Sequence, residues 1–308
     1  MSKDRLKSYT LLLVVAAIWG IAGPVIKYTL PNFPPMVFLT YRFFISTLLM
    51  LPIVWVFKPK FLYSKREIVM LTAAGLLGST LNLGLLFLGI EKTTVLDAII
   101  IGNTAPIFVV IGGMYFLKEK ISKKELAGII VTFFGTLIIV VQPLFEGNLF
   151  NSQAIVGNLL IVAANIAWVF YVIITKTELK HRVDNLTMTT FTFLIGFLTS
   201  LPFALLQTKG AVNLLLMVSA APLLSHLGVW YMAVLSGSLA YFLYQEGQRK
   251  IEASEATLFG YLSPLFAAPL AIFWLKETLS VPFIIGTAVV TIGVFIAEYK
   301  KVTKKGIE

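Results

Sequence analysis

The chain has 308 residues, of which 58% are hydrophobic and only 13% are charged, and its mean hydropathy is +0.89. Because about a quarter of the residues in a soluble domain are charged, this composition excludes an ordinary soluble protein. The sequence contains no cysteine, which excludes disulfides, thiolate metal sites and thiol catalysis. The net charge of +10 is therefore interpreted first as membrane topology and not as a sign of nucleic-acid binding.

Hydrophobic runs long enough to cross a bilayer recur along the whole chain. A spanning helix needs about 20 apolar residues, and ten of them would leave room only for short connections. We therefore predict an all-α polytopic membrane protein with ten transmembrane helices, the first of them uncleaved. The stretch 213–224 is also apolar and is expected to form an interfacial helix or a re-entrant piece. The predicted spans are 9–29, 36–57, 68–90, 94–117, 125–143, 156–176, 186–207, 226–247, 253–275 and 281–299.

Basic residues in the connections predict the orientation in the membrane. Of the 25 Lys and Arg residues, 20 lie in the terminal segments and in every second connection, on the side of the N-terminus. The other side has only Lys92, Lys209 and Lys276. Lys27 and Arg42 fall inside spans. Since positively charged loops stay in the cytoplasm, both termini are predicted to be cytoplasmic, and the basic charge needs no nucleic-acid partner.

The second half of the sequence repeats the first. At an offset of 158 residues, 116–119 (FLKE) aligns with 274–277 (WLKE), and further identities follow in the same order over about 120 residues. We predict two five-helix repeats, 1–148 and 149–308. Because five is an odd number, the second repeat enters the membrane from the opposite side. Many secondary transporters are built from such inverted repeats and bind their substrate near mid-membrane.

Several of these motifs resemble a known family. Trp19-Gly20 in the first span, 40–43 (TYRF) in the second, and the related segments 106–119 and 264–277 are similar to the EamA-type branch of the drug/metabolite transporter superfamily. The resemblance covers nearly the whole chain. It implies ten helices, transport of small metabolites, and a central cavity lined by the first, third, fourth, sixth, eighth and ninth helices. It does not identify the substrate.

Aromatic and amide side chains at mid-depth are the first candidates for a substrate site. Trp19 and Trp168 occupy repeat-related positions, although tryptophan normally prefers the membrane interfaces. They either line a cavity or pack between helices. Asn165 shares a helix face with Trp168 and is expected to face protein or water, because an amide facing lipid is costly. Asn82 lies among small residues and Tyr241 among aromatic ones, which would leave space for a flat ligand or simply allow close helix packing.

The fourth and ninth spans each place a polar residue one turn before a proline. The pairs are Asn103 with Pro106 and Tyr261 with Pro264. A proline within a helix frees a carbonyl and bends the axis, so Pro106 and Pro264 are predicted helix kinks, either beside a ligand or purely structural. The polar groups of Asn103 and Tyr261 would then lie close to the bend.

Two charged side chains in or beside the spans need an explanation. Arg42 lies in the second span, where a charge near the bilayer centre costs a few kcal/mol. It could bind a carboxylate or phosphate of a substrate through two parallel hydrogen bonds, or it could snorkel to the headgroups or form a structural ion pair. Glu277 closes the ninth span, and we expect it to cap the last helix together with Ser280.

The sequence carries no recognisable enzymatic motif. It has no Gly-rich phosphate loop, and neither His181 nor His226 has an evident partner for hydrolytic or metal chemistry. We predict a multi-pass protein of the cytoplasmic membrane that exports a small organic metabolite by alternating access, with membrane lipids around it and without cofactor or metal. A nucleotide-sugar or lipid-linked substrate transporter, or a non-transporting scaffold or sensor, are the alternatives. The predicted substrate-binding residues are Trp19, Arg42, Asn82, Asn103, Asn165, Trp168, Tyr241 and Tyr261.

The predicted orientation can be tested with single cysteines, because the chain has none of its own. An impermeant thiol reagent should label Lys209→Cys in intact cells and should label Lys60→Cys only after permeabilisation. The reason is that the connection with Lys209 is predicted to face outward, whereas the connection with Lys60 is predicted to face the cytoplasm. Labelling of Lys60→Cys in intact cells would contradict the orientation.

Overall fold

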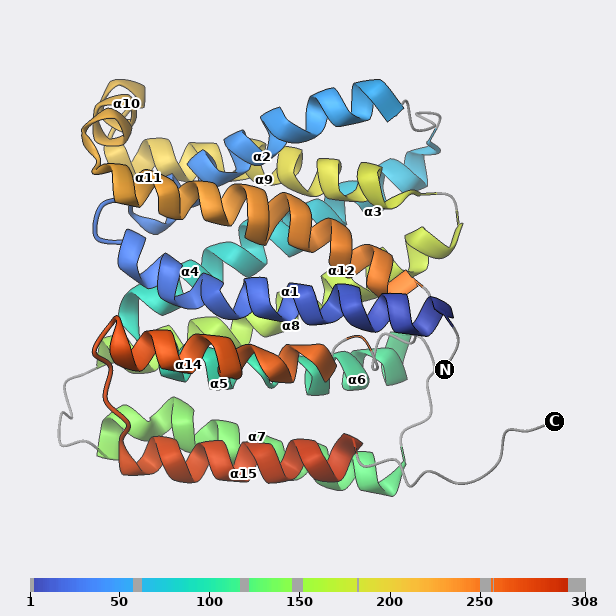
Figure 1. Cartoon of the computed structure of the whole chain (residues 1–308), viewed down its shortest axis with the longest axis vertical. Coiled ribbons are helices and arrows are strands. Elements are labelled where there is room, and N and C mark those ends of the chain that lie inside the picture. The colour runs from blue at the N-terminus through green and yellow to red at the C-terminus, as the bar shows by residue number, and fades with distance from the viewer. Residues whose placement is uncertain are drawn as a thin grey trace.

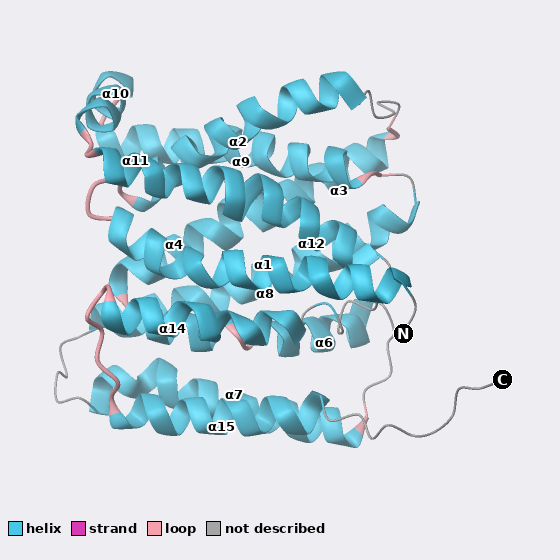
Figure 2. Cartoon of the chain, viewed as in Figure 1, coloured by secondary structure: helices cyan, strands magenta, loops and turns pink. Residues whose placement is uncertain are grey.

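The computed structural model describes residues 3–57, 63–116, 122–145, 152–181, 183–249, 256 and 258–298. Within these ranges all regular structure is helical, and no strand is present (Figure 2). Most helices run side by side along one direction and are joined at two opposite faces of the molecule (Figure 1). Helices satisfy their backbone hydrogen bonds within the segment, as a lipid bilayer requires.

The helical elements follow the predicted hydrophobic segments closely. In chain order they are α1 (Lys3–Thr29), α2 (Pro35–Phe57), α3 (Lys65–Leu76), η1 (Leu77–Leu81), α4 (Asn82–Lys92), α5 (Val95–Gly102), α6 (Ala105–Phe116), α7 (Lys123–Phe145), α8 (Ser152–His181), α9 (Asn185–Thr208), α10 (Ala211–Ala220), α11 (Leu223–Trp230), η2 (Tyr231–Leu239), α12 (Ala240–Arg249), η3 (Leu258–Leu262), α14 (Ser263–Phe273) and α15 (Val281–Glu298).

Seven helical segments of the described chain are long and apolar enough to cross a membrane. They confirm the predicted all-helical polytopic membrane protein, while the count of ten spans stays a prediction. The seven segments are Leu6–Thr29, Pro35–Val56, Lys65–Lys92, Val95–Phe116, Gln153–Glu178, Asn185–Thr208 and Leu223–Gln248. Three shorter apolar helices are Leu126–Val140, Ala211–Ala220 and Val281–Gly293.

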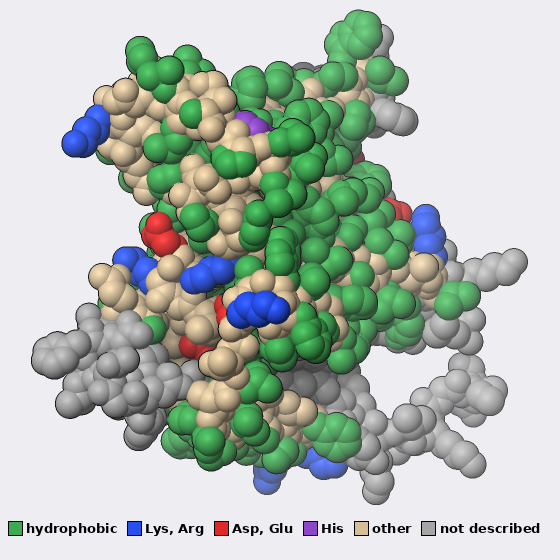
Figure 3. All heavy atoms as spheres, turned by 60° about the vertical axis from the view of Figure 1, so that its left-hand side comes forward, with side chains coloured by type: hydrophobic (Ala, Val, Ile, Leu, Met, Phe, Trp, Pro, Cys, Tyr) green, Lys and Arg blue, Asp and Glu red, His purple; other side chains and the backbone are tan. Residues whose placement is uncertain are grey.

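The outside of the bundle is apolar. Large hydrophobic side chains such as Trp55, Leu206 and Phe295 point outward and are 76%, 75% and 64% exposed. In the space-filling view the hydrophobic side chains form a broad band, and most of the charged side chains visible there lie outside it (Figure 3). Because exposed apolar surface on this scale is unfavourable in water, it is the surface that lipid covers.

Three of the seven segments are interrupted near their middle, and the ninth predicted span contains a 3₁₀-helix. The π-helix η1 separates α3 from α4, and the π-helix η2 separates α11 from α12. Residues 103 and 104 separate α5 from α6, and the 3₁₀-helix η3 precedes α14. A π-turn shifts the backbone hydrogen-bond pattern by one residue and is frequent at functional sites. These interruptions fall in the third, fourth, eighth and ninth predicted spans.

Helices of the first and second halves pack against each other in matching pairs. Helix α2 packs on α9 at one edge of the bundle, and α7 packs on α15 at the opposite edge (Figure 1). Between these edges, α1 packs on α12 and α14, while α8 packs on α4 and α6. The beginning of α1 and the end of α15 lie at the same face of the bundle (Figure 1).

The apolar stretch that followed the seventh predicted span forms the short helix α10. It is viewed nearly end-on in Figure 1 and therefore runs across the direction of the main helices, at one face of the bundle. None of its residues is buried, and Val212 is 71% exposed. Of the two expectations for this stretch, this placement favours the interfacial helix.

The close contact between α7 and α15 generates a stability prediction. A Cβ added at Gly293 would lie 2.5 Å from the backbone nitrogen of Thr132 and 2.9 Å from the carbonyl oxygen of Gly128. Since backbone atoms cannot swing aside, Gly293→Ala should push the helices apart and cost about 1–3 kcal/mol.

The measurement is the thermal unfolding of the purified protein in detergent. Gly102→Ala is the matched control, because a Cβ at Gly102 meets no atom within 4 Å. The control should melt at the wild-type temperature or slightly above it, since Ala favours a helix more than Gly does. Equal melting temperatures for the two variants would contradict the packing described.

Candidate functional site

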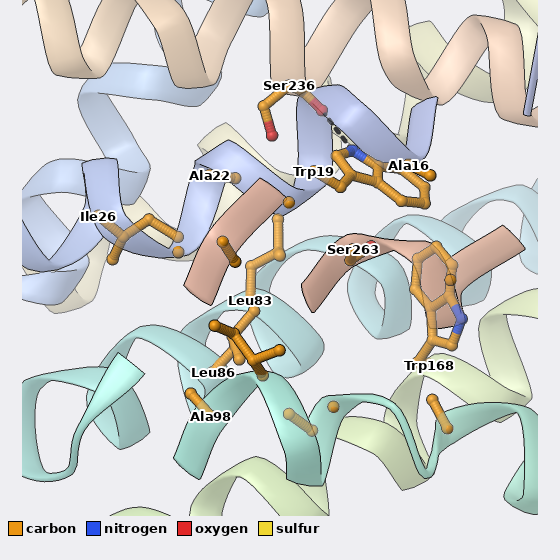
Figure 4. A pocket seen from close by; sticks show the side chains of 18 of the residues that line it. Ala16, Trp19, Ala22, Ile26, Leu83, Leu86, Ala98, Trp168, Ser236 and Ser263 are labelled. Carbon is orange, nitrogen blue, oxygen red and sulfur yellow. Dashed lines mark hydrogen bonds between the residues drawn. The ribbon is translucent and has the colours of Figure 1, made fainter. Parts of the chain in front are cut away.

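A cavity of about 270 Å³ lies inside the bundle. Its walls come from α1, α4, α5, α6, α8, η2, α12, η3 and α14, and Arg42 of α2 reaches it as well. The cavity extends along α1 from the level of Leu12 to that of Ile26. The close-up view shows Trp19 and Trp168 pointing into this cavity, with Leu83 and Leu86 on its other side (Figure 4).

Most of the residues predicted to bind substrate meet at this cavity. Seven of the eight contribute to its wall: Trp19, Arg42, Asn82, Asn103, Asn165, Trp168 and Tyr241. The eighth, Tyr261, lies in η3, but its side chain is outside the described part of the chain. The structure therefore brings together side chains from six separate segments that are up to 222 positions apart in the sequence.

Four aromatic rings form one continuous cluster in the wall. The ring centroids of Trp19 and Trp168 are 5.8 Å apart, and those of Trp19 and Tyr241 are 5.6 Å apart, both with an edge-on geometry. Tyr244 lies 5.2 Å from Trp19 and 5.7 Å from Trp168. Both interpretations of the tryptophans hold at once, because they line a cavity and also pack against neighbouring rings.

Two of these rings also bind the interrupted helices. The indole nitrogen of Trp19 donates to the carbonyl oxygen of Ser236 in η2 at 3.0 Å (Figure 4). The hydroxyl of Tyr241 donates to the carbonyl oxygen of Gly78 in η1 at 3.1 Å. A donor from another helix can satisfy a carbonyl that the irregular π-helical pattern leaves open. The rings are therefore oriented by the backbone of both π-helices.

The three asparagines lie at different structural positions. The amide nitrogen of Asn82 donates to the carbonyl oxygen of Ala164 at 2.8 Å and ties α4 to α8. Asn165 donates to the carbonyl oxygen of Ile101 at 2.8 Å, at the end of α5. Asn103 follows α5 as its C-cap residue and lines the cavity. Asn165 thus stabilises the break between α5 and α6. Asn103 lies at the same break and lines the cavity.

Both prolines predicted as kinks lie in the first turn of a helix. Pro106 is the second residue of α6, and Pro264 is the second residue of α14. The side chains of both are outside the described part of the chain. Proline is tolerated in a first turn because the amide hydrogen it lacks has no partner there. The α-helix is therefore interrupted in the residues before each proline, at 103 and 104 and at η3, and the kinks themselves stay a prediction.

Arg42 is enclosed by protein and does not reach the headgroups. Its side chain is 1% exposed, and its guanidinium lies 5.7 Å from the ring of the adjacent Phe43. Its Nε and Nη1 atoms have no hydrogen-bond partner among the described residues. Within the described part of the chain Arg42 forms no ion pair, and its role, structural or in substrate binding, stays a prediction.

Charged groups close one end of the cavity, next to Ile26. The ammonium of Lys27 donates to the carbonyl oxygens of Ile90 at 2.6 Å and Thr93 at 2.5 Å, at the end of α4. The carboxylate of Glu277 accepts from the backbone nitrogens of Val95 at 2.7 Å and Leu96 at 3.0 Å, at the start of α5. A cation at a helix C-terminus and an anion at a helix N-terminus both stabilise the helix dipole.

The position of Glu277 corrects the sequence-based expectation for this residue. Glu277 caps α5, far away in the sequence, while Ser280 alone caps α15 by accepting from the backbone nitrogen of Phe283 at 3.3 Å. The amides at the start of α5 are open donors, and a carboxylate from α14's end satisfies them across the bundle. Spacing along the sequence could not reveal this partner.

Tyr244 is an aromatic residue of the wall that the sequence analysis did not include among the substrate-binding residues. It lies one turn after Tyr241 on the same face of α12, and this shared face was the available signal. Its hydroxyl is buried and has no hydrogen-bond partner among the described residues. For metal ions, the described residues hold no group of three His, Asp or Glu side chains that could act as ligands.

A polytopic helical bundle with a buried central cavity defines a class of membrane proteins that bind a ligand within the membrane. The comparisons give the family. The sequence model of the EamA-like transporter family matches residues 6–141 and again residues 155–299, so the chain belongs to this family, which is part of the drug/metabolite transporter superfamily. The predicted resemblance is confirmed, and the chain is a multi-pass membrane protein of a transporter family.

Relatives and a solved structure agree with this assignment. An uncharacterized transporter of Archaeoglobus fulgidus is 28% identical over 298 residues, covering 96% of this chain and 98% of the relative. The uncharacterized transporter YetK of Bacillus subtilis is 29% identical over 307 residues, covering 97% and 89%. A protein of known crystal structure matches 97% of both chains with a TM-score of 0.61 at 14% identity, which shows the same fold. These names indicate a transporter rather than an enzyme.

The cap on α5 yields a stability prediction. Glu277→Gln keeps the shape but removes the charge and one of the two acceptors, so it should cost about 0.5–2 kcal/mol. The readout is the melting temperature in detergent. Glu91→Gln removes an exposed carboxylate from the same face and should change stability by less than about 0.5 kcal/mol. If Glu277→Gln melts like Glu91→Gln, the cap contributes nothing.

Proposed function

We propose that this chain is a secondary transporter of the cytoplasmic membrane that exports a small organic metabolite by alternating access. The observation that carries the proposal is the cavity of about 270 Å³ inside the bundle, with an aromatic cluster and few polar groups in its wall. Ligand sites in proteins have this composition, with apolar walls for contact area and a few polar groups for orientation. Membership of the EamA-like transporter family supports transport of a ligand that binds in this cavity.

The proposed architecture has ten spans in two inverted five-helix repeats, 1–148 and 149–308, with both termini in the cytoplasm. The family model supports it by matching one stretch in each half. The matching contacts of α1 with α12 and α14, and of α8 with α4 and α6, support it further. The π-helices η1 and η2 lie in the third and the eighth proposed spans, at related places in the two repeats.

Alternating access requires that the two ends of the cavity open in turn. One end of the cavity lies beside the hydrogen bonds of Lys27 and Glu277. Lys27 joins α1 to the end of α4, and Glu277 joins the segment after α14 to the start of α5. The other end lies at the apolar cluster that includes Leu12, Tyr244 and Ala256. Each end is built from segments of both proposed repeats, so a relative movement of the repeats can separate one set of contacts and close the other.

The residues of the wall have different proposed roles. Trp19, Trp168, Tyr241 and Tyr261 would stack against the substrate. Asn82, Asn103 and Asn165 would orient it by hydrogen bonds, with Asn103 the most accessible of the three because it lies at the break between α5 and α6. Arg42 would bind an acidic group of the substrate. Pro106 and Pro264 would keep the helix starts at α6 and α14 fixed.

The alternatives fit the cavity less well. Pockets for drug-sized ligands measure about 300–1,000 Å³, so the cavity of about 270 Å³ is small for a nucleotide sugar or a lipid-linked compound. A non-transporting scaffold would have no use for the buried atoms of Arg42 and Tyr244 that lack hydrogen-bond partners among the described residues, because such groups destabilise the fold.

The proposal is tested by transport in proteoliposomes. A thermal-shift screen of amino acids, vitamins, nucleosides and carboxylic acids identifies ligands that stabilise the protein. Exchange of the labelled hit is then compared between the wild type, Asn103→Ala and Trp168→Ala. Loss of a hydrogen bond or a ring contact should lower affinity about 5- to 150-fold.

Ile166→Ala is the matched control for these variants. Ile166 lies on the same helix as Trp168 but is 46% exposed on the outside of the bundle, so its variant should exchange substrate like the wild type. Inside-out vesicles should accumulate the substrate if the direction is export. Wild-type exchange by both cavity variants, with normal melting temperatures, would place the site elsewhere.

A further inference from the structure

We propose that the cavity selects compounds that carry one carboxylate on an apolar body, and that the guanidinium of Arg42 binds this carboxylate. The inference rests on the proposed function, because it names the substrate class of the same cavity. It goes further by requiring a single negative charge on the substrate and by excluding amines as the preferred class.

Arg42 is a buried cation without a counter-ion in the described part of the chain. It lines the cavity, and its Nε and Nη1 atoms have no partner among the described residues. Neither of the ion pairs found there, Lys7 with Glu246 and Arg66 with Glu178, includes it. Enclosing an unpaired guanidinium costs several kcal/mol unless hydrogen bonds and an opposite charge compensate. A carboxylate ligand would supply both.

The groups around Arg42 are engaged with the backbone and leave the guanidinium for a ligand. The hydroxyl of Ser46, one turn further along α2, donates to a carbonyl oxygen of η2 at 3.0 Å. The hydroxyl of Tyr241 donates to a carbonyl oxygen of η1. Gly237 of η2 lies beside the guanidinium, since a Cβ there would lie 3.5 Å from Nη2, an ordinary contact distance. The wall is therefore held in place by contacts that do not use Arg42.

The charge of the wall indicates an anion and not a zwitterion. Arg42 is the one charged side chain among the described residues that line the cavity, so no carboxylate is available there for an ammonium group. One guanidinium balances one negative charge and matches the planar carboxylate with two parallel hydrogen bonds, which favours a carboxylate over a phosphate dianion.

The rest of the wall fits an apolar body. The rings of Trp19, Trp168 and Tyr244 and the aliphatic side chains opposite them supply contact area without charge. The hydroxyl of Tyr244 has no partner among the described residues and can donate to a polar substituent of the ligand. An aromatic or branched aliphatic monocarboxylate of modest size matches these features together.

Three compounds of similar shape separate charge from size. They are 3-phenylpropionate, its neutral amide 3-phenylpropionamide, and the zwitterion phenylalanine. Binding to the purified full-length protein in detergent is measured by calorimetry, and exchange is measured in proteoliposomes with labelled compound. We expect 3-phenylpropionate to bind at least about tenfold more tightly than either of the others and to be exchanged.

Variants of Arg42 test the residue itself. Arg42→Gln should weaken binding of 3-phenylpropionate about tenfold or more and leave binding of the amide within about twofold. Arg42→Lys keeps the charge but not the planar guanidinium, so its affinity for 3-phenylpropionate should lie between those of the wild type and Arg42→Gln. If Arg42→Gln does not fold, Arg42→Lys replaces it in the test. Lys65→Gln removes an exposed positive charge at the start of α3 and is the matched control, with wild-type binding expected.

The outcomes distinguish this inference from the proposed function. Equal affinities for the three compounds, or unchanged affinity after Arg42→Gln in a folded protein, would overturn the role of Arg42. Exchange of the amide or of phenylalanine would then leave the transport function standing. Exchange of none of the three overturns the carboxylate inference, whereas the transport function falls only if the wider metabolite panel also gives no exchange.

Discussion

A chain surrounded by lipid must satisfy its own backbone, and this requirement is most demanding where helices are interrupted. Here side chains from other segments bond three of the four interruptions, η1, η2 and the break between α5 and α6, and also the facing ends of α4 and α5. Asn165 binds the end of α5, Glu277 binds its start, and Lys27 binds the end of α4. Trp19 and Tyr241 bind the π-helices η2 and η1. Since each unsatisfied group would cost several kcal/mol in lipid, the cavity depends on these bonds.

The same side chains that hold the interruptions also form the cavity wall. Trp19, Tyr241 and Asn165 each have one polar atom on a helix break and other atoms toward the cavity. A ligand that contacts these side chains therefore acts on the geometry of the breaks directly, without any additional moving element. This dual use also means that a substitution in the wall changes packing and binding together, so stability has to be measured beside affinity.

Much of the fold and of the wall was predictable from the sequence, because hydrophobic length determines spans and because Trp19, Trp168 and Asn165 are costly at mid-depth unless they face protein or a cavity. Other features depend on contacts between distant segments and leave no local signal. The π-helices have ordinary helical residues, so periodicity reads them as α-helix. The cap on α5 comes from Glu277, 182 positions away, and the enclosure of Arg42 depends on the packing of η2.

The two edges of the bundle have a consequence for any movement between its halves. At one edge α2 packs on α9, and at the other α7 packs on α15 with backbone atoms close together at Gly293. A line joining these two pairs runs across the helices, and α1, α4, α8 and α14, which line the cavity, lie between the pairs (Figure 1). Turning one half against the other about this line leaves both pairs in contact, while it widens the bundle at one face and narrows it at the other. In the proposed alternating access, these two helix pairs would act as the pivot.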